Sequence, residues 1–134
     1  MTLADAVVDA SAAVRGLTIE GEAGELLARI ADGASVGHAP ALIVAEVSNA
    51  LALAARTEQR SLDEALRMVE RLVSSPLRLH PLAPLAPSAI ELAATSLLSA
   101  YDSFYAVLAA ALDLPLVTAD RRLAEAVPGS VLVS

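Results

Sequence analysis

The chain has 134 residues, a formal net charge of −7 and no cysteine, and hydrophobic residues make up 56% of it. This length fits one domain spanning residues 1–134, and the apolar content excludes a disordered chain. Without cysteine, a disulfide scaffold, a cysteine-held zinc or iron–sulfur site and a thiol nucleophile are excluded. The acidic balance argues against a protein that coats nucleic acid, but it allows an enzyme that holds nucleic acid through a metal ion and a few arginines.

In its first half, the chain alternates short apolar runs with segments of helical spacing. Pro40 is expected to open a helix, because proline favours the first helical position. Ser61 and Glu64 have the spacing of a capping box at the start of another helix. In chain order we expect a strand at residues 6–8, a short helix or turn at 10–14, a helix at 20–32, a strand at 36–38, a helix from 40 to about 57 and a helix from 62 to 73.

The second half repeats this alternation and contains a segment rich in proline. Residues 81–87 contain three prolines and are expected to form an extended surface crossing within the domain. We expect a strand at 77–80, helices at 88–98 and 101–112, a strand at 114–118, a short helix after Asp120 and a last strand at 131–133. Short strands alternating with helices favour a parallel sheet with helices on both faces.

The apolar content raises the question of a membrane segment, since the mean hydropathy is +0.61. The longest uncharged stretch, residues 33–45, is too short to span a bilayer. The apolar segment Leu92–Leu112 has Asp102 near its centre, and the N-terminal residues lack the basic start of a signal peptide. We therefore expect a cytoplasmic protein that does not enter a membrane.

Two of the sixteen acidic residues follow predicted strands. Asp9 ends the first strand, and Asp120 follows the strand at 114–118. In an open parallel sheet, ligands bind beyond the carboxyl ends of the strands, so both positions suit a functional site. Each aspartate could equally be the N-cap of the helix that follows it.

Two further acids lie within apolar segments that are predicted to be helical. Glu46 is surrounded by aliphatic residues, and Asn49 lies one turn further on the same helix. Asp102 is the only charged residue between Leu92 and Leu112. A buried carboxylate is costly without a partner, which favours a functional role, although Glu46 and Asn49 could also belong to an exposed polar stripe.

If these four acids converge, their like charges should raise the pKa of at least one of them unless a cation neutralises them. Without cysteine, the available ligands are oxygen atoms, which suit Mg²⁺ or Mn²⁺ and can support attack by water at phosphorus. We expect His38 and His80 to be structural or exposed. The three aromatic residues, Tyr101, Phe104 and Tyr105, are expected to pack in the core.

Three segments carry a resemblance to a known family: VVDASAAV at 7–14, HAPALIVAEVSNAL at 38–51 and AYDSFYAVLAAALDLPLVTADRRLA at 100–124. They resemble the PIN-domain family and, within it, the VapC-type toxins of bacterial toxin–antitoxin pairs. The resemblance implies a three-layer α/β/α sandwich around a parallel sheet and an endoribonuclease dependent on Mg²⁺ or Mn²⁺. It also implies a homodimer and a cognate VapB-type antitoxin whose basic segment enters the acidic pocket.

The resemblance also assigns roles to individual residues. The catalytic acids, which hold one or two ions, would be Asp9, Glu46, Asp102 and Asp120. The small polar residues around the metal would be Ser11, Asn49 and Thr118. Arg15, Arg121 and Arg122 are candidates for contacts with RNA phosphates, and a role as ordinary surface arginines is the alternative.

Two other functions stay open at this point. A catalytically silent module could use the acidic pocket to bind a basic protein partner. A receiver-like domain could be phosphorylated at Asp9, although the sequence lacks the adjacent acid pair and the lysine that such sites usually use.

Overall fold

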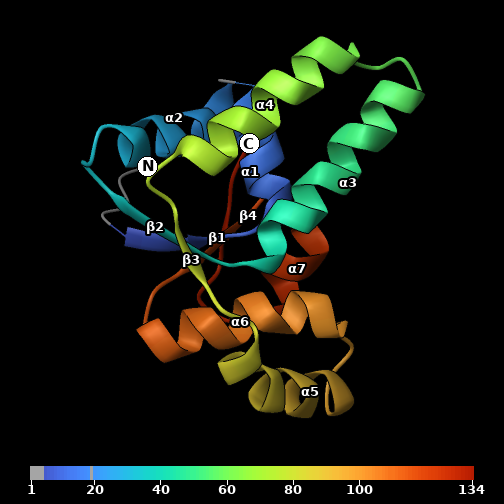
Figure 1. The fold of residues 1–134 in the computed structure, drawn as a ribbon. Helices are drawn as coiled ribbons and strands as arrows, with labels where there is room; N and C mark the ends of the chain where they lie inside the picture. Colours follow the sequence, from blue (N-terminus) through green and yellow to red (C-terminus); the bar gives the residue numbers. More distant parts are fainter. Residues whose placement is uncertain (1–4, 19) are drawn as a thin grey trace.

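The computed structural model describes residues 5–18 and 20–134, and a five-stranded parallel sheet runs through its centre (Figure 1). The spatial order of the strands is β3-β2-β1-β4-β5. Their bounds are β1 (Asp5–Val8), β2 (Val36–Pro40), β3 (Arg78–His80), β4 (Leu116–Thr118) and β5 (Val131–Leu132). The first strand of the described chain therefore lies in the middle of the sheet.

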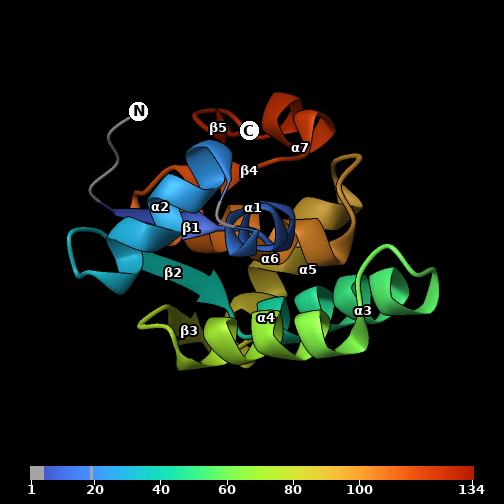
Figure 2. The ribbon, with the colours of Figure 1, turned by 90° about the horizontal axis from the view of Figure 1, so that it is seen from above.

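Helices cover both faces of this sheet (Figures 1 and 2). One face carries α1 (Ala10–Leu17), α2 (Gly21–Ala31), α3 (Leu42–Arg56) and α4 (Leu62–Ser74), and the other carries α5 (Ala86–Ala94) and α6 (Ala100–Leu112). The short helix α7 (Arg121–Ala126) follows β4 and contacts β4 and β5. This arrangement confirms the predicted three-layer α/β/α sandwich. In the described part of the chain, no helix combines the length and the apolar character needed to cross a membrane.

The core is built on the two central strands, β1 and β4. Val7 and Val8 of β1 and Leu116 and Val117 of β4 are all buried. A parallel sheet covered on both faces requires such continuous apolar runs, and full burial of each side chain contributes about 1.5–3 kcal/mol. The strands pair with Val7 opposite Leu116, so their carboxyl ends lie side by side.

Helices α1 and α2 approach each other closely at Gly16. A Cβ atom at this position would lie 2.6 Å from Leu27 Cδ1 and 2.7 Å from the Ala23 carbonyl oxygen. Only glycine fits without displacing the second helix. The contact packs α2 onto α1, the helix that follows Asp9.

Three predicted boundaries are wrong: the one at Pro40, the one at residues 81–87 and the end of the helix predicted at 88–98. Prolines or hydroxyl side chains explain them. Pro40 ends β2 instead of opening a helix, and the hydrogen bond after it is made by Ala41 N, which donates to the His80 carbonyl at 2.8 Å. Residues 81–87 are not extended, because a 3₁₀ turn covers Ala83–Leu85 and Pro87 lies in the first turn of α5. Proline is tolerated there because the first turn of a helix needs no N–H donors.

Helix α5 also ends earlier than predicted. The hydroxyl of Thr95 donates to the carbonyl of Glu91, and the hydroxyl of Ser96 donates to that of Leu92. Such side-chain bonds compete with the helix for its last carbonyl groups. The helix stops at Ala94, and Leu97 lies fully exposed beyond it.

The two histidines face each other across neighbouring strands. His38 of β2 and His80 of β3 are half-buried, and His38 Nδ1 lies 2.9 Å from His80 Nε2. One ring therefore donates to the other, which requires both rings to be neutral or only one to be charged. Burial lowers the pKa of His38 below its ordinary value of 6.5, and the nearby His80 and Arg78 act in the same direction.

Candidate active site

The site begins where the order of the strands reverses. From β1 the chain builds outward to β2 and β3 on one side, and later to β4 and β5 on the other. The reversal leaves a crevice at the carboxyl ends of β1 and β4, the usual ligand position in open parallel sheets. Asp9 directly follows β1, and Asp120 lies two residues after β4. The topology thus brings together two acids that are far apart in sequence.

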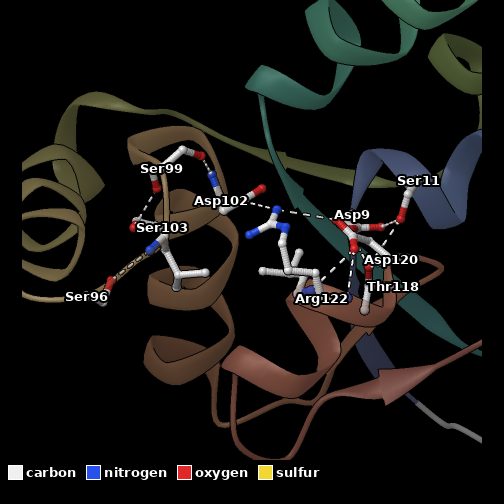
Figure 3. A network of polar contacts seen from close by, with 11 residues as sticks. Asp9, Ser11, Ser96, Ser99, Asp102, Ser103, Thr118, Asp120 and Arg122 are labelled. Carbon is white, nitrogen blue, oxygen red and sulfur yellow. Dashed lines mark hydrogen bonds and ion pairs between the residues drawn. The ribbon is translucent and has the colours of Figure 1, made fainter.

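Asp9 is buried, with 5% of its surface exposed, and is held by three donors. Its Oδ1 accepts from Ala12 N at 2.9 Å and from the Ser11 hydroxyl at 2.8 Å, and its Oδ2 accepts from the Thr118 hydroxyl at 2.6 Å (Figure 3). The bond to Ala12 makes Asp9 the N-cap of α1, so the capping role coexists with a place in the site. Burial raises the pKa of Asp9, and these hydrogen bonds oppose the rise.

Glu46 projects from α3 and meets Tyr105 of α6. The Tyr105 hydroxyl donates to Glu46 Oε1 at 2.6 Å, and Tyr105 itself is buried. Burial raises the pKa of Glu46, the bond from Tyr105 opposes the rise, and the charges of Asp102 and Asp9 add to it. The mutual influence of three carboxylates shows that they share one electrostatic environment.

Asp102 and Asp120 are joined by a cation from the same chain. Asp102 lies in the first turn of α6, and Asp120 is the N-cap of α7. Arg122 Nη2 donates to Asp102 Oδ2 at 3.0 Å and to Asp120 Oδ2 at 3.4 Å (Figure 3). The pKa of Arg122 is raised by its bond to Asp102 and by both negative charges.

These side chains surround one pocket of about 530 Å³ between α1, α3, α6 and the start of α7. All four predicted acids line it, together with predicted residues Ser11 and Arg15. Thr118 is buried beneath it and bonds to both Ser11 and Asp9. Asn49, Arg121 and Arg122 are exposed and are not among the described residues that line it; on α3, Ala50 does so.

The oxygen atoms of these acids are suitable ligands for a hard divalent cation. In residues 5–18 and 20–134, however, no group of three or more acidic or histidine side chains lies in an arrangement that could hold a metal ion. The predicted rise in pKa is present at Asp9 and Glu46, but burial rather than mutual repulsion is its main cause.

Two residues have roles at the site that the sequence does not predict. The sequence predicts only a packing role in the core for Tyr105, yet its hydroxyl donates a hydrogen bond to Glu46. The available signal is its spacing, because Tyr105 lies three residues after Asp102 and therefore on the same face of α6. Arg122 is a candidate for contacting an RNA phosphate, with an ordinary surface arginine as the alternative; in the structure it pairs with two of the acids, and the contact with RNA stays a prediction.

The chain is similar over most of its length to proteins of one known family. Residues 6–127 match the PIN domain. Ribonuclease VapC12 of Mycobacterium tuberculosis is 40% identical over 119 residues, which cover 89% of each chain. Ribonuclease VapC1 of the same organism is 35% identical over 127 residues, which cover 93% of this chain and 92% of the relative.

Solved structures show the same fold. PAE2754 from Pyrobaculum aerophilum superimposes with a TM-score of 0.77 at 25% identity, covering 94% of this chain and 81% of the other. VapBC2 from Rickettsia felis, solved with a DNA fragment from its promoter, gives a TM-score of 0.67 at 14% identity, covering 96% of each chain. The family match over nearly the whole chain and the identity to VapC ribonucleases establish that this chain belongs to the PIN-domain family.

Proposed function

We propose that this chain is a metal-dependent endoribonuclease that acts in the cytoplasm as the toxin of a toxin–antitoxin pair. The observation that carries the proposal is the convergence of Asp9, Glu46, Asp102 and Asp120 on one pocket at the strand reversal. The relatives that are named ribonuclease VapC support the same activity.

The four carboxylates fit one or two Mg²⁺ or Mn²⁺ ions. They are hard oxygen donors from four elements, and the two whose pKa is raised gain most from a nearby positive charge. Because no three of these side chains lie in an arrangement that could hold an ion, some would have to move or to reach the ion through water. When bound, the ion would supply positive charge to the scissile phosphate and to the attacking water.

The residues of the chain would provide positioning and proton transfer. Ser11 and Thr118 fix both oxygens of Asp9, and Tyr105 fixes one oxygen of Glu46. Glu46 is only half-buried and has a raised pKa, so its other oxygen suits the acceptance of a proton from water as that water attacks phosphorus. The phosphorus–oxygen bond of the leaving nucleotide then breaks, and solvent protonates the leaving oxygen.

Arginines at the pocket would contact the RNA backbone. Arg15 lines the pocket and is exposed, so its guanidinium can reach a phosphate bound there. Arg121 and Arg122 are not among the lining residues, and Arg122 would first have to leave its two aspartates. Arg15 is therefore the strongest candidate of the three.

The partner would be a VapB-type antitoxin, and the toxin itself would be a homodimer. The Arg122 guanidinium already pairs with two acids of the pocket, Asp102 and Asp120, so a basic segment of a partner has suitable acceptors there. The net charge of −7 favours association with a cationic segment.

The decisive experiment compares the wild type with Asp102→Asn, both free of antitoxin. We expect Mn²⁺ binding by calorimetry and cleavage of RNA in the wild type, and the loss of both in the variant. Asp113→Asn is the matched control, because Asp113 lies at the other end of α6 in the left-handed conformation that asparagine tolerates. Undiminished cleavage by Asp102→Asn would refute the mechanism.

A silent module that captures a basic partner is the second candidate, and the pairing of Arg122 with two of the pocket acids favours it. It predicts tight binding of an arginine-containing peptide by a wild type that cleaves no RNA with either metal. The receiver-like alternative is set aside, because the chain belongs to the PIN-domain family and both oxygens of Asp9 already accept hydrogen bonds.

A further inference from the structure

Arg122 forms ion pairs that connect two elements of the fold. Of the ion pairs among the described residues, the other one joins Arg60 and Glu64 within a single helical turn. Arg122 instead connects α7 to α6 through Asp120 and Asp102 (Figure 3). Its guanidinium thus occupies the space between two carboxylates that come from different elements of the pocket.

The Arg122 guanidinium holds one carboxylate oxygen of each aspartate. Asp120 Oδ1 already accepts from Arg122 N at 2.9 Å and from Leu123 N at 3.4 Å as the cap of α7. The remaining oxygen of Asp120, Oδ2, faces the Arg122 guanidinium. Asp102 likewise contributes Oδ2 to this guanidinium. A divalent ion that binds Asp120 through Oδ2 therefore competes with Arg122, and it competes at Asp102 as well when it takes Oδ2 there.

Arg122 is able to leave. Its side chain is 62% exposed, and those of Asp102 and Asp120 are 23% and 38% exposed. Ion pairs that are this accessible to water are weak and are screened by salt. Among the described residues its side chain has no further hydrogen-bond partner that would hold it in place.

We propose that Arg122 is an internal counter-ion that pairs Asp102 with Asp120 in the metal-free protein and is displaced when a divalent ion binds. The proposal rests on the proposed metal site. Arg122 then lowers the affinity of the site for the ion, because each binding event must break its two contacts and leave its positive charge close by. In the metal-free protein, it offsets the repulsion between the carboxylates of Asp102 and Asp120.

Calorimetric titration of antitoxin-free protein with Mn²⁺ at low ionic strength tests this proposal. We expect Arg122→Gln to bind Mn²⁺ about three- to tenfold more tightly than the wild type, since a unit charge near a divalent ion is removed. Arg122→Lys keeps the charge and should stay within about twofold of the wild type. Arg121→Gln is the matched control at the adjacent exposed position, where it should also stay within about twofold.

Thermal unfolding supplies a second readout that does not depend on activity. Arg122→Gln should lower the melting temperature of the metal-free protein relative to Arg121→Gln, because Asp102 and Asp120 lose their counter-ion. With saturating Mn²⁺ this difference should disappear, since the ion then neutralises the same acids.

Each contrary result has a distinct meaning. Equal or weaker Mn²⁺ binding by Arg122→Gln, with normal binding by the wild type, would overturn the counter-ion proposal and leave the metal site intact. If the wild type binds no Mn²⁺ while it remains folded, the proposed metal site fails and the counter-ion proposal fails with it.

Discussion

Replacing Tyr105 with phenylalanine tests how the pocket controls Glu46. The substitution removes only the hydroxyl that donates to Glu46 Oε1 at 2.6 Å and leaves the buried ring in place. Glu46 then loses the hydrogen bond that opposes the effect of burial on its pKa. The variant should be less stable, and Glu46 should take up a proton at a higher pH.

The magnitude follows from the burial of the two partners. A hydrogen bond to a charged group contributes about 1.5–3 kcal/mol. Because Glu46 is half-buried and water can replace part of the lost bond, we expect a loss of about 1.5 kcal/mol. For a domain of this length, that loss corresponds to a melting temperature lower by about 5 °C. The lost hydrogen bond would also raise the pKa of Glu46 further, because only burial and the neighbouring negative charges would then act on it.

Urea unfolding followed by far-ultraviolet circular dichroism measures the effect, with Tyr101→Phe as the control. Tyr101 lies on the same helix, but it is 61% exposed, so its substitution should change the free energy of unfolding little. The loss of stability in Tyr105→Phe should reach its full size above the raised pKa of Glu46. It should shrink as the pH falls through that pKa, because a neutral carboxyl group gains less from the hydroxyl than a carboxylate does. Equal stability of the two variants at neutral pH would refute the reasoning.

Three more predictions concern the scaffold. Thr118→Val removes the buried hydroxyl that bonds to Asp9 and should cost about 2 kcal/mol in urea unfolding, whereas an unchanged midpoint would contradict this. Gly16→Ala places a Cβ atom 2.7 Å from the Ala23 carbonyl oxygen and should also cost about 2 kcal/mol; wild-type thermal unfolding would show that α2 can move aside. The pKa of His38 is lowered in the folded protein, so below pH 6.5 the unfolded chain binds a proton at His38 more readily than the folded chain does. The free energy of unfolding should therefore rise with pH up to about 6.5 and then level off. His38→Gln should flatten this part of the curve of stability against pH, and an equally steep curve in the variant would assign the effect elsewhere.

The sequence predicts the acids of the site because each has a clear position relative to an element. Asp9 and Asp120 follow apolar strands, and a parallel sheet brings the ends of such strands to one edge. Glu46 and Asp102 are identified as charges within apolar helices, where burial demands a partner. The alternation of strands and helices was likewise sufficient for the layered fold.

Pairwise contacts could not be predicted in the same way, because they depend on how distant elements pack. The spacing of Tyr105 places it on a face of α6, but the position of Glu46 on α3 decides that its hydroxyl acts in the pocket. Helix α5 shows the same limit at a local scale. Its apolar spacing continues to Leu98, while the hydroxyls of Thr95 and Ser96 capture the carbonyls that would extend it.

The position of β1 in the middle of the sheet has a consequence for the timing of protein synthesis. Thr118, which supports Asp9, lies 109 residues later in the chain. Closing a loop of that length costs about 4 kcal/mol of entropy, which must be offset by the pairing of β4 with β1. A growing polypeptide on a ribosome therefore contains Asp9 and Glu46 long before it can assemble the pocket. The pocket cannot form until Asp102, Thr118 and Asp120 have been synthesised as well.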